Sequence, residues 1–159
     1  KLTMLSERRT NFFLNNQINR FLPAFLNLEQ PGLTLGLQGL QFVATSTTSQ
    51  SQTLGYPQYL HSIPTNRDNQ DIVSMGTDAA LLCARVLENA YIVTAIELIS
   101  LTQAIDHQSS VNRISSQSQK LYHFARSHFP VIKKDRFISP DLNQLIEALK
   151  ESSLLKEMN

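Results

Sequence analysis

The residues with the most evident chemistry lie between His61 and Gly76, in a stretch dense in amide side chains. Asn66, Asn69 and Gln70 stand close together there. Side-chain amides both donate and accept hydrogen bonds, so a cluster of them before a helix can bind an anionic or amine-bearing small molecule. The same residue types are also ordinary loop and capping residues. Residue chemistry alone leaves both interpretations open.

Other candidate sites are not supported by their spacing. Ser116 and Ser118 both miss the Ser-x-x-Lys spacing toward Lys120. The glycines at 32, 36 and 39 lack the pattern of a phosphate-binding loop, so we expect them to allow close backbone packing at a helix start. The four histidines show no i, i+4 pairing and no partner cysteine, so no metal site is expected at them: His61, His107, His123 and His128.

The elements around the amide cluster are predicted to be a loop followed by a long helix. Residues 56–71 are rich in Pro, Asn and Asp and predict an ordered loop. Residues 71–74 offer a side-chain cap to a helical pattern that continues to Ile105, and a helix over 73–105 would be about 50 Å long. It is apolar around most of its circumference, with Cys83 expected to be a small buried hydrophobe, so we expect neighbours on most sides.

The remaining chain also reads as helical, which makes the predicted fold class all-α, a long-helix bundle. Helices are expected over 2–25, with a turn at 29–32, and over 33–54. Residues 107–119 are polar, and shorter helices follow over 120–128 and 140–150, the last capped by Ser139.

Composition excludes several classes of protein. The chain has 159 residues, of which 42% are hydrophobic and 17% charged, and its net charge is +1. So small a positive charge does not indicate binding to nucleic acid or to an anionic membrane. We find no apolar run near the roughly 18 residues that span a bilayer, and expect a cytoplasmic protein. The sequence begins inside a helical pattern, so we expect a fragment of a longer chain.

Residues 62–76 closely resemble the Ser-Ile-Pro-Thr … Val-Ser-Met-Gly signature of the aromatic amino acid ammonia-lyases, the histidine, phenylalanine and tyrosine lyase family. Residues 22–26, 88–89, 95–98 and 103–106 agree with it. The resemblance implies the C-terminal part of an oligomeric helical fold. Residues 1–106 would form part of the central bundle, with an active-site loop at 56–72, and residues 107–159 a helical extension of the same domain.

The resemblance implies an enzyme that eliminates ammonia from an aromatic L-amino acid to give a trans-2-enoic acid. In this family an internal Ala-Ser-Gly cyclises to methylidene-imidazolone (MIO), the electrophile. That tripeptide is absent here, and the family's catalytic tyrosine and carboxylate-binding arginine would also lie upstream. The fragment alone is therefore expected to hold no catalytic residue and to be inactive, and the intact enzyme to be a homotetramer.

The same resemblance makes Asn66, Asn69 and Gln70 substrate-binding residues. Histidine lyases place a glutamate at the position of Gln70, whereas phenylalanine and tyrosine lyases place a glutamine. A buried carboxylate beside an apolar ring would be costly to desolvate, so the amide favours Phe or Tyr over His. Two alternatives stay open: an aromatic amino acid 2,3-aminomutase and a catalytically inert helical oligomerisation module.

Overall fold

The computed structural model describes residues 1–30 and 32–152, and these residues form an all-α structure, as predicted. Pro31 of the expected turn and residues 153–159 of the expected extension lie outside the described residues. Within the described part of the chain, strand-like pairing is limited to an isolated bridge between Thr65 and Gln70. The helices are α1 (Leu2–Leu14), α2 (Asn16–Asn19), α3 (Gln38–Leu54), α4 (Gly76–His107), α5 (Ser116–His128) and α6 (Ser139–Glu151), with short 3-10 turns η1 (Ala24–Leu26), η2 (Gln58–His61) and η3 (Val111–Arg113).

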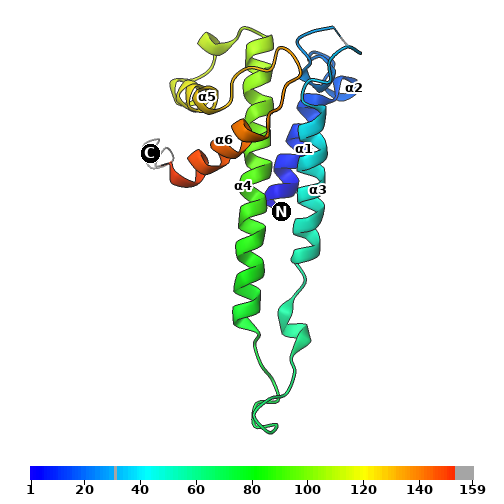
Figure 1. Ribbon diagram of the computed structural model, residues 1–159, viewed down its shortest axis with the longest axis vertical. Helices are drawn as coiled ribbons and strands as arrows, with labels where there is room; N and C mark the ends of the chain where they lie inside the picture. Colours follow the sequence, from blue (N-terminus) through cyan, green and yellow to red (C-terminus); the bar gives the residue numbers. More distant parts are fainter. Residues whose placement is uncertain (31, 153–159) are drawn as a thin grey trace.

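Helix α4 is the long central helix against which α1, α3, α5 and α6 pack (Figure 1). Helices α1 and α3 run along it, and α5 and α6 gather around its C-terminal half. The segment that joins α3 to α4 extends beyond the helices at the opposite end, far from α5 and α6. The protein therefore separates a packed end from an extended loop.

The hydrophobic core lies at the packed end. Val93, Ile96 and Ile99 of α4 are fully buried. The first buried residue along α4 is Asn89, so the helix is buried only in its C-terminal part. Val93, Ile96 and Ile99 belong to one cluster with buried residues from α1, α3, α5, α6 and the segments beside them, including Leu14, Leu26, Leu37, Phe129, Ile132 and Leu145. The described residues give the N-terminal half of α4 no comparable cover.

Helix α1 turns its polar side inward. Thr3, Ser6 and Thr10 are buried, whereas Leu2 is 78% and Leu5 48% exposed. An amphipathic helix normally buries its apolar stripe. The outward apolar stripe of α1 therefore lies where this chain alone does not cover it.

The predicted helix over 2–25 is interrupted, which corrects the sequence analysis. Asn15 adopts an extended conformation between α1 and α2, and its side chain accepts the N–H of Gln17. The side-chain amide of Asn19 donates to the carbonyls of Phe12 and Asn15. Asparagine side chains compete with the helix for backbone hydrogen bonds, and that competition breaks the pattern here.

Gly36 explains why α3 begins at Gln38 and not at residue 33. It has a left-handed φ of 58°, and a Cβ there would lie 2.7 Å from the carbonyl oxygen of Phe25. The close packing expected of the glycines is thus found at Gly36. Gly32 instead has a φ of 91°, and a Cβ added at Gly32 or at Gly39 would meet no atom within 4 Å.

The long helix was predicted correctly in kind, but its start and its surroundings differ. No side chain of residues 71–74 caps α4; Met75 precedes it in a left-handed conformation without a side-chain cap hydrogen bond. Cys83 is exposed, not buried, because it lies in the half of α4 that the other helices leave uncovered.

The C-terminal helices differ from prediction at their starts. Helix α5 begins at Ser116, four residues before the predicted start at Lys120. The Ser115 side chain accepts the N–H of Ser118, and this cap stabilises a helical start in the polar residues before Lys120. Helix α6 includes Ser139 as its first residue, and Ile138 precedes it without a side-chain cap.

By length and composition alone, α4 is a helix that could cross a membrane. The sequence analysis found no such run because the charges along the helix interrupt it. Core helices of soluble proteins pass the same test when mostly buried; here 22% of the apolar window is buried, and the C-terminal half of α4 lies in the core.

Candidate functional site

The segment between α3 and α4 carries the predicted substrate-binding residues. It leaves α3 at Gly55, forms η2, and reaches α4 at Gly76. The rings of Tyr56 and His61 pack together with centroids 5.0 Å apart at its beginning. The predicted loop over 56–71 is thus an ordered connection, and η2 is a short helical turn that the sequence analysis missed.

Residues 62–73, here called the loop hairpin, fold back on themselves. At the base, the Val73 N–H donates to the Ser62 Oγ at 2.7 Å. Further along, Thr65 and Gln70 exchange backbone hydrogen bonds of 3.0 and 3.3 Å. The base and this pair hold the two limbs of the hairpin together.

The tip of the loop hairpin has an unusual backbone. Asn66, Arg67 and Asp68 all have left-handed φ values, of 56°, 54° and 63°. Asparagine and aspartate tolerate this region better than most residues, whereas arginine does not. The Asn69 N–H donates to the Asn66 carbonyl at 3.2 Å and completes the turn.

The structure brings the three predicted site residues onto this single turn. Asn66, Asn69 and Gln70 are all exposed. Their side chains are therefore accessible to solvent on a turn that projects from the helices. The substrate-binding role that the sequence analysis gives to these three residues stays a prediction.

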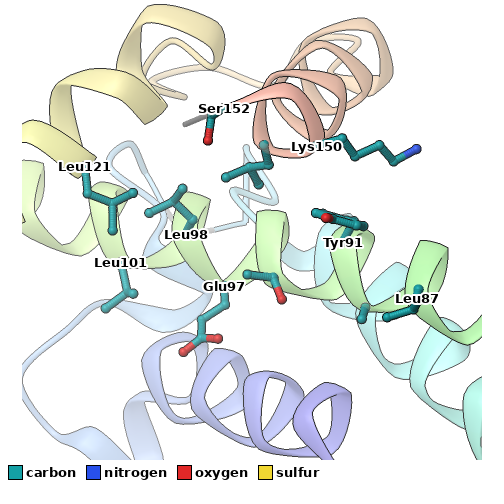
Figure 2. Close-up of a pocket in the computed structure, with 11 residues that line it drawn as sticks. Leu87, Tyr91, Glu97, Leu98, Leu101, Leu121, Lys150 and Ser152 are labelled. Carbon is teal, nitrogen blue, oxygen red and sulfur yellow. The ribbon is translucent and has the colours of Figure 1, made fainter. Parts of the chain in front are cut away.

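An apolar cavity lies elsewhere, between α4, α5 and α6 (Figure 2). Its volume is about 550 Å³, and its walls are mostly apolar. Figure 2 shows Glu97 pointing toward α1, where its carboxylate pairs with Arg9 at 3.3 Å. The apolar side chains that line the cavity include Leu87, Tyr91, Leu98, Leu101, Leu121 and Leu149.

The cationic group at the rim of this cavity is already engaged. Lys150 Nζ lies 2.6 Å from Glu88 and 3.0 Å from Glu147. Hydrogen bonding to Glu88, and then to Glu147, raises the pKa of Lys150 above its ordinary value. A group held cationic in this way is a poor general base, so the cavity favours apolar packing over acid–base chemistry.

A partly buried polar cluster at the packed end was missed from the sequence. Arg126 pairs with Asp106 at 2.5 Å, and the Tyr122 hydroxyl donates to the same carboxylate. Burial, followed by this hydrogen bond, raises the pKa of Tyr122. The fully buried Gln103 donates to the Ile132 carbonyl at 2.7 Å. In the sequence, Gln103 and Asp106 near the end of the long apolar helix were the residues that could have indicated this cluster.

Among residues 1–30 and 32–152, no three His, Cys, Asp or Glu side chains come together as a candidate metal site. The 159 residues also contain no Ala-Ser-Gly tripeptide. The residues of this chain therefore do not form an MIO group, and no chemical step is assigned to it here.

Comparison with known proteins extends the resemblance across the whole chain. A profile of the aromatic amino acid lyase family matches residues 1–127. A tyrosine ammonia-lyase of Cupriavidus metallidurans is 33% identical over 98% of this chain and 29% of its own length. An MIO-dependent tyrosine 2,3-aminomutase of Streptomyces globisporus is 34% identical over 98% and 29%, and a histidine ammonia-lyase of Geobacillus thermodenitrificans 37% identical over 97% and 30%.

Solved structures agree with these relatives. The tyrosine aminomutase of Streptomyces globisporus matches with a TM-score of 0.92 at 34% identity, over 97% of this chain and 29% of that one. The histidine ammonia-lyase of Trypanosoma cruzi matches with a TM-score of 0.89 at 30% identity, over 98% and 30%. The chain spans about 30% of the length of the relatives that it matches. With a family match over most of its residues and a shared helical fold, this chain belongs to the aromatic amino acid lyase family.

Proposed function

We propose that this chain is the C-terminal part of an ammonia-lyase that removes ammonia from L-Phe or L-Tyr, in preference to L-His, and gives a trans-2-enoic acid. The observation that carries the proposal is Gln70, a neutral amide exposed on the loop hairpin. The family resemblance associates glutamine at this position with phenylalanine and tyrosine, and glutamate with histidine.

The role proposed for the loop hairpin is to form one wall of a substrate pocket in the intact protein. Asn66, Asn69 and Gln70 would contact the substrate, and the electrophile and base would come from upstream residues. An amide can hydrogen-bond a phenol or an amine without leaving an unpaired charge against an aromatic ring. This division of labour predicts that the 159-residue chain alone is inactive.

The proposed organisation keeps residues 1–106 as part of a central bundle and residues 107–159 as its extension, in a cytoplasmic homotetramer. The uncovered half of α4 and the outward apolar stripe of α1 support an assembly. The packing of α5 and α6 against α4 supports an extension of the same domain over the described residues.

A 2,3-aminomutase is the second candidate, because a relative of 34% identity carries that name. Both reactions begin from the same amino acid, so the products separate them. The intact protein should be incubated with L-Tyr, L-Phe and L-His, and the products resolved by chromatography and mass spectrometry. We expect an unsaturated acid and free ammonia from Tyr or Phe.

An accumulating β-amino acid would identify the aminomutase instead. Faster turnover of His than of Tyr and Phe would contradict the proposed substrate preference. An intact protein that turns over none of the three amino acids would favour a helical oligomerisation module. The isolated 159-residue chain is the matched control, and it should give no product.

A further inference from the structure

We propose that Ser62 is a positioning residue, whose hydroxyl closes the base of the loop hairpin and thereby fixes Gln70 for substrate binding. This inference rests on the proposed function. The carrying observation is the 2.7 Å hydrogen bond from the Val73 N–H to the Ser62 Oγ, which joins residues eleven positions apart. No role in the reaction follows for Ser62 itself.

The two closures of the loop hairpin differ in what they require of the sequence. Thr65 and Gln70 pair through backbone atoms, so residues other than proline can take either position. The bond at the base needs an acceptor in the side chain at position 62. The identity of that one side chain therefore decides whether the base is closed.

The burial pattern also indicates that Ser62 and Val73 attach the loop hairpin to the rest of the fold. Ser62 and Val73 are half-buried, whereas every residue from 63 to 72 is exposed. The exposed part of the hairpin has little packing to hold it in place. Its position relative to the helices is consequently set at the base.

Residues 63–65, which join the base of the loop hairpin to its tip, have a restricted backbone, so the placement of the base also fixes the placement of the tip. Pro64 fixes its own φ and restricts Ile63 to extended conformations. Thr65 follows at once and holds Gln70 through the backbone pair. A change at Ser62 therefore moves Gln70 as part of a unit.

The test uses the intact protein and three variants: Ser62→Ala, Ser62→Thr and, as a matched control, Ser74→Ala. Ser62→Ala removes the acceptor, Ser62→Thr keeps a hydroxyl, and Ser74 is an exposed serine beyond the hairpin. We expect Ser62→Ala to raise KM for L-Tyr by about three- to tenfold, the effect of losing one hydrogen bond, with kcat changed less than about twofold. Ser62→Thr and Ser74→Ala should resemble the wild type.

Amide hydrogen exchange provides a readout that does not depend on turnover. Exchange at Val73 and Gln70 should be about three- to tenfold faster in Ser62→Ala than in the wild type, for the same energetic reason. A double-mutant cycle adds the link to binding: once Gln70→Ala is present, adding Ser62→Ala should change KM little further.

With an active wild type, three results would each overturn the inference. These are an unchanged KM for L-Tyr in Ser62→Ala, an unchanged amide exchange rate at Val73 and Gln70, and KM effects of Ser62→Ala and Gln70→Ala that add fully. A Ser62→Ala protein that does not fold leaves Ser62→Thr decisive, because a threonine variant with raised KM and wild-type exchange would also refute it. A wild-type protein inactive on all aromatic amino acids would instead refute the proposed function, and this inference with it.

Discussion

Gln70 places a neutral amide on the loop hairpin where glutamate would place a negative charge. Beside an aromatic ring, an unpaired carboxylate costs about 1–3 kcal/mol in mutational terms. We therefore expect Gln70→Glu in the intact protein to lower kcat/KM on L-Phe or L-Tyr by roughly ten- to a hundredfold, at about 1.4 kcal/mol per decade. Activity on L-His should fall less, or rise. Steady-state kinetics on the three amino acids measure this.

Gln144→Glu is the control for this substitution, because it adds the same charge at an exposed position of α6, far from the loop hairpin. It should leave the order of the three substrates unchanged. If Gln70→Glu changed kcat/KM equally on Phe, Tyr and His, Gln70 would have no part in substrate choice and would act only as a residue near a helix start.

Tyr122 makes stability depend on alkaline pH. Its pKa is raised above the ordinary value of 10.0, first by burial and then by the hydrogen bond to Asp106, so the fold favours the neutral phenol. A raised pKa gives a contribution that is complete below pH 10.0 and is lost as pH rises through the folded-state value. Tyr122→Phe should cost about 1–2 kcal/mol at neutral pH.

Urea unfolding followed by circular dichroism checks this at neutral pH and above pH 10.0. The stability difference between wild type and Tyr122→Phe should shrink at the higher pH. Tyr59→Phe is the control, because Tyr59 is 70% exposed, and it should show no such dependence. An equal difference at both pH values would remove Tyr122 as the titrating group.

At the scale of elements, Gly36 fixes where α3 starts. Its left-handed φ and the 2.7 Å approach of a Cβ to the Phe25 carbonyl both oppose a side chain. We expect Gly36→Ala to destabilise the protein by about 1–3 kcal/mol, measured by urea unfolding. Gly39→Ala, in the first turn of α3 with open space around it, should be neutral or stabilising by up to about 1 kcal/mol. The reverse order of the two variants would contradict this account.

The elements that the sequence predicted best are those with a local cause. The run after Gly76 has no proline or glycine, and α4 follows it to His107. Its start was predicted wrongly because Met75 is left-handed, and methionine carries no local signal for that conformation. Ser62 as a hydrogen-bond acceptor was also missed, since its partner Val73 is remote in sequence. The amide positions on the turn could be named from the family motif alone, but not their shared exposure.

At the scale of the whole molecule, the uncovered apolar surface predicts assembly. Leu81 is 64% and Leu87 57% exposed on α4, a helix of about 50 Å, and Leu2 and Leu5 lie outward on α1. Burying each such side chain contributes about 1.5–3 kcal/mol. We expect the intact protein to be a homo-oligomer, tetrameric, by light scattering at micromolar concentration.

Leu81→Lys together with Leu87→Lys should shift the intact protein toward smaller species, because charges would enter an apolar contact. Asn143→Lys adds a charge at an exposed position of α6 and should leave the assembly unchanged. A monodisperse, folded monomer in the wild type would refute the prediction.

The position of the loop hairpin has a consequence for how this protein can diversify. Residues 63–72 are exposed and project away from the core of this chain, so replacing side chains there removes little contact with the described helices. Substitutions that alter ligand choice commonly reduce stability, which limits how many can accumulate. Under the proposed function, the residues that select the substrate and the core that stabilises this chain lie at opposite ends of one long helix. We therefore expect substitutions at 66–70 to change ligand choice without loosening the packed core of this chain.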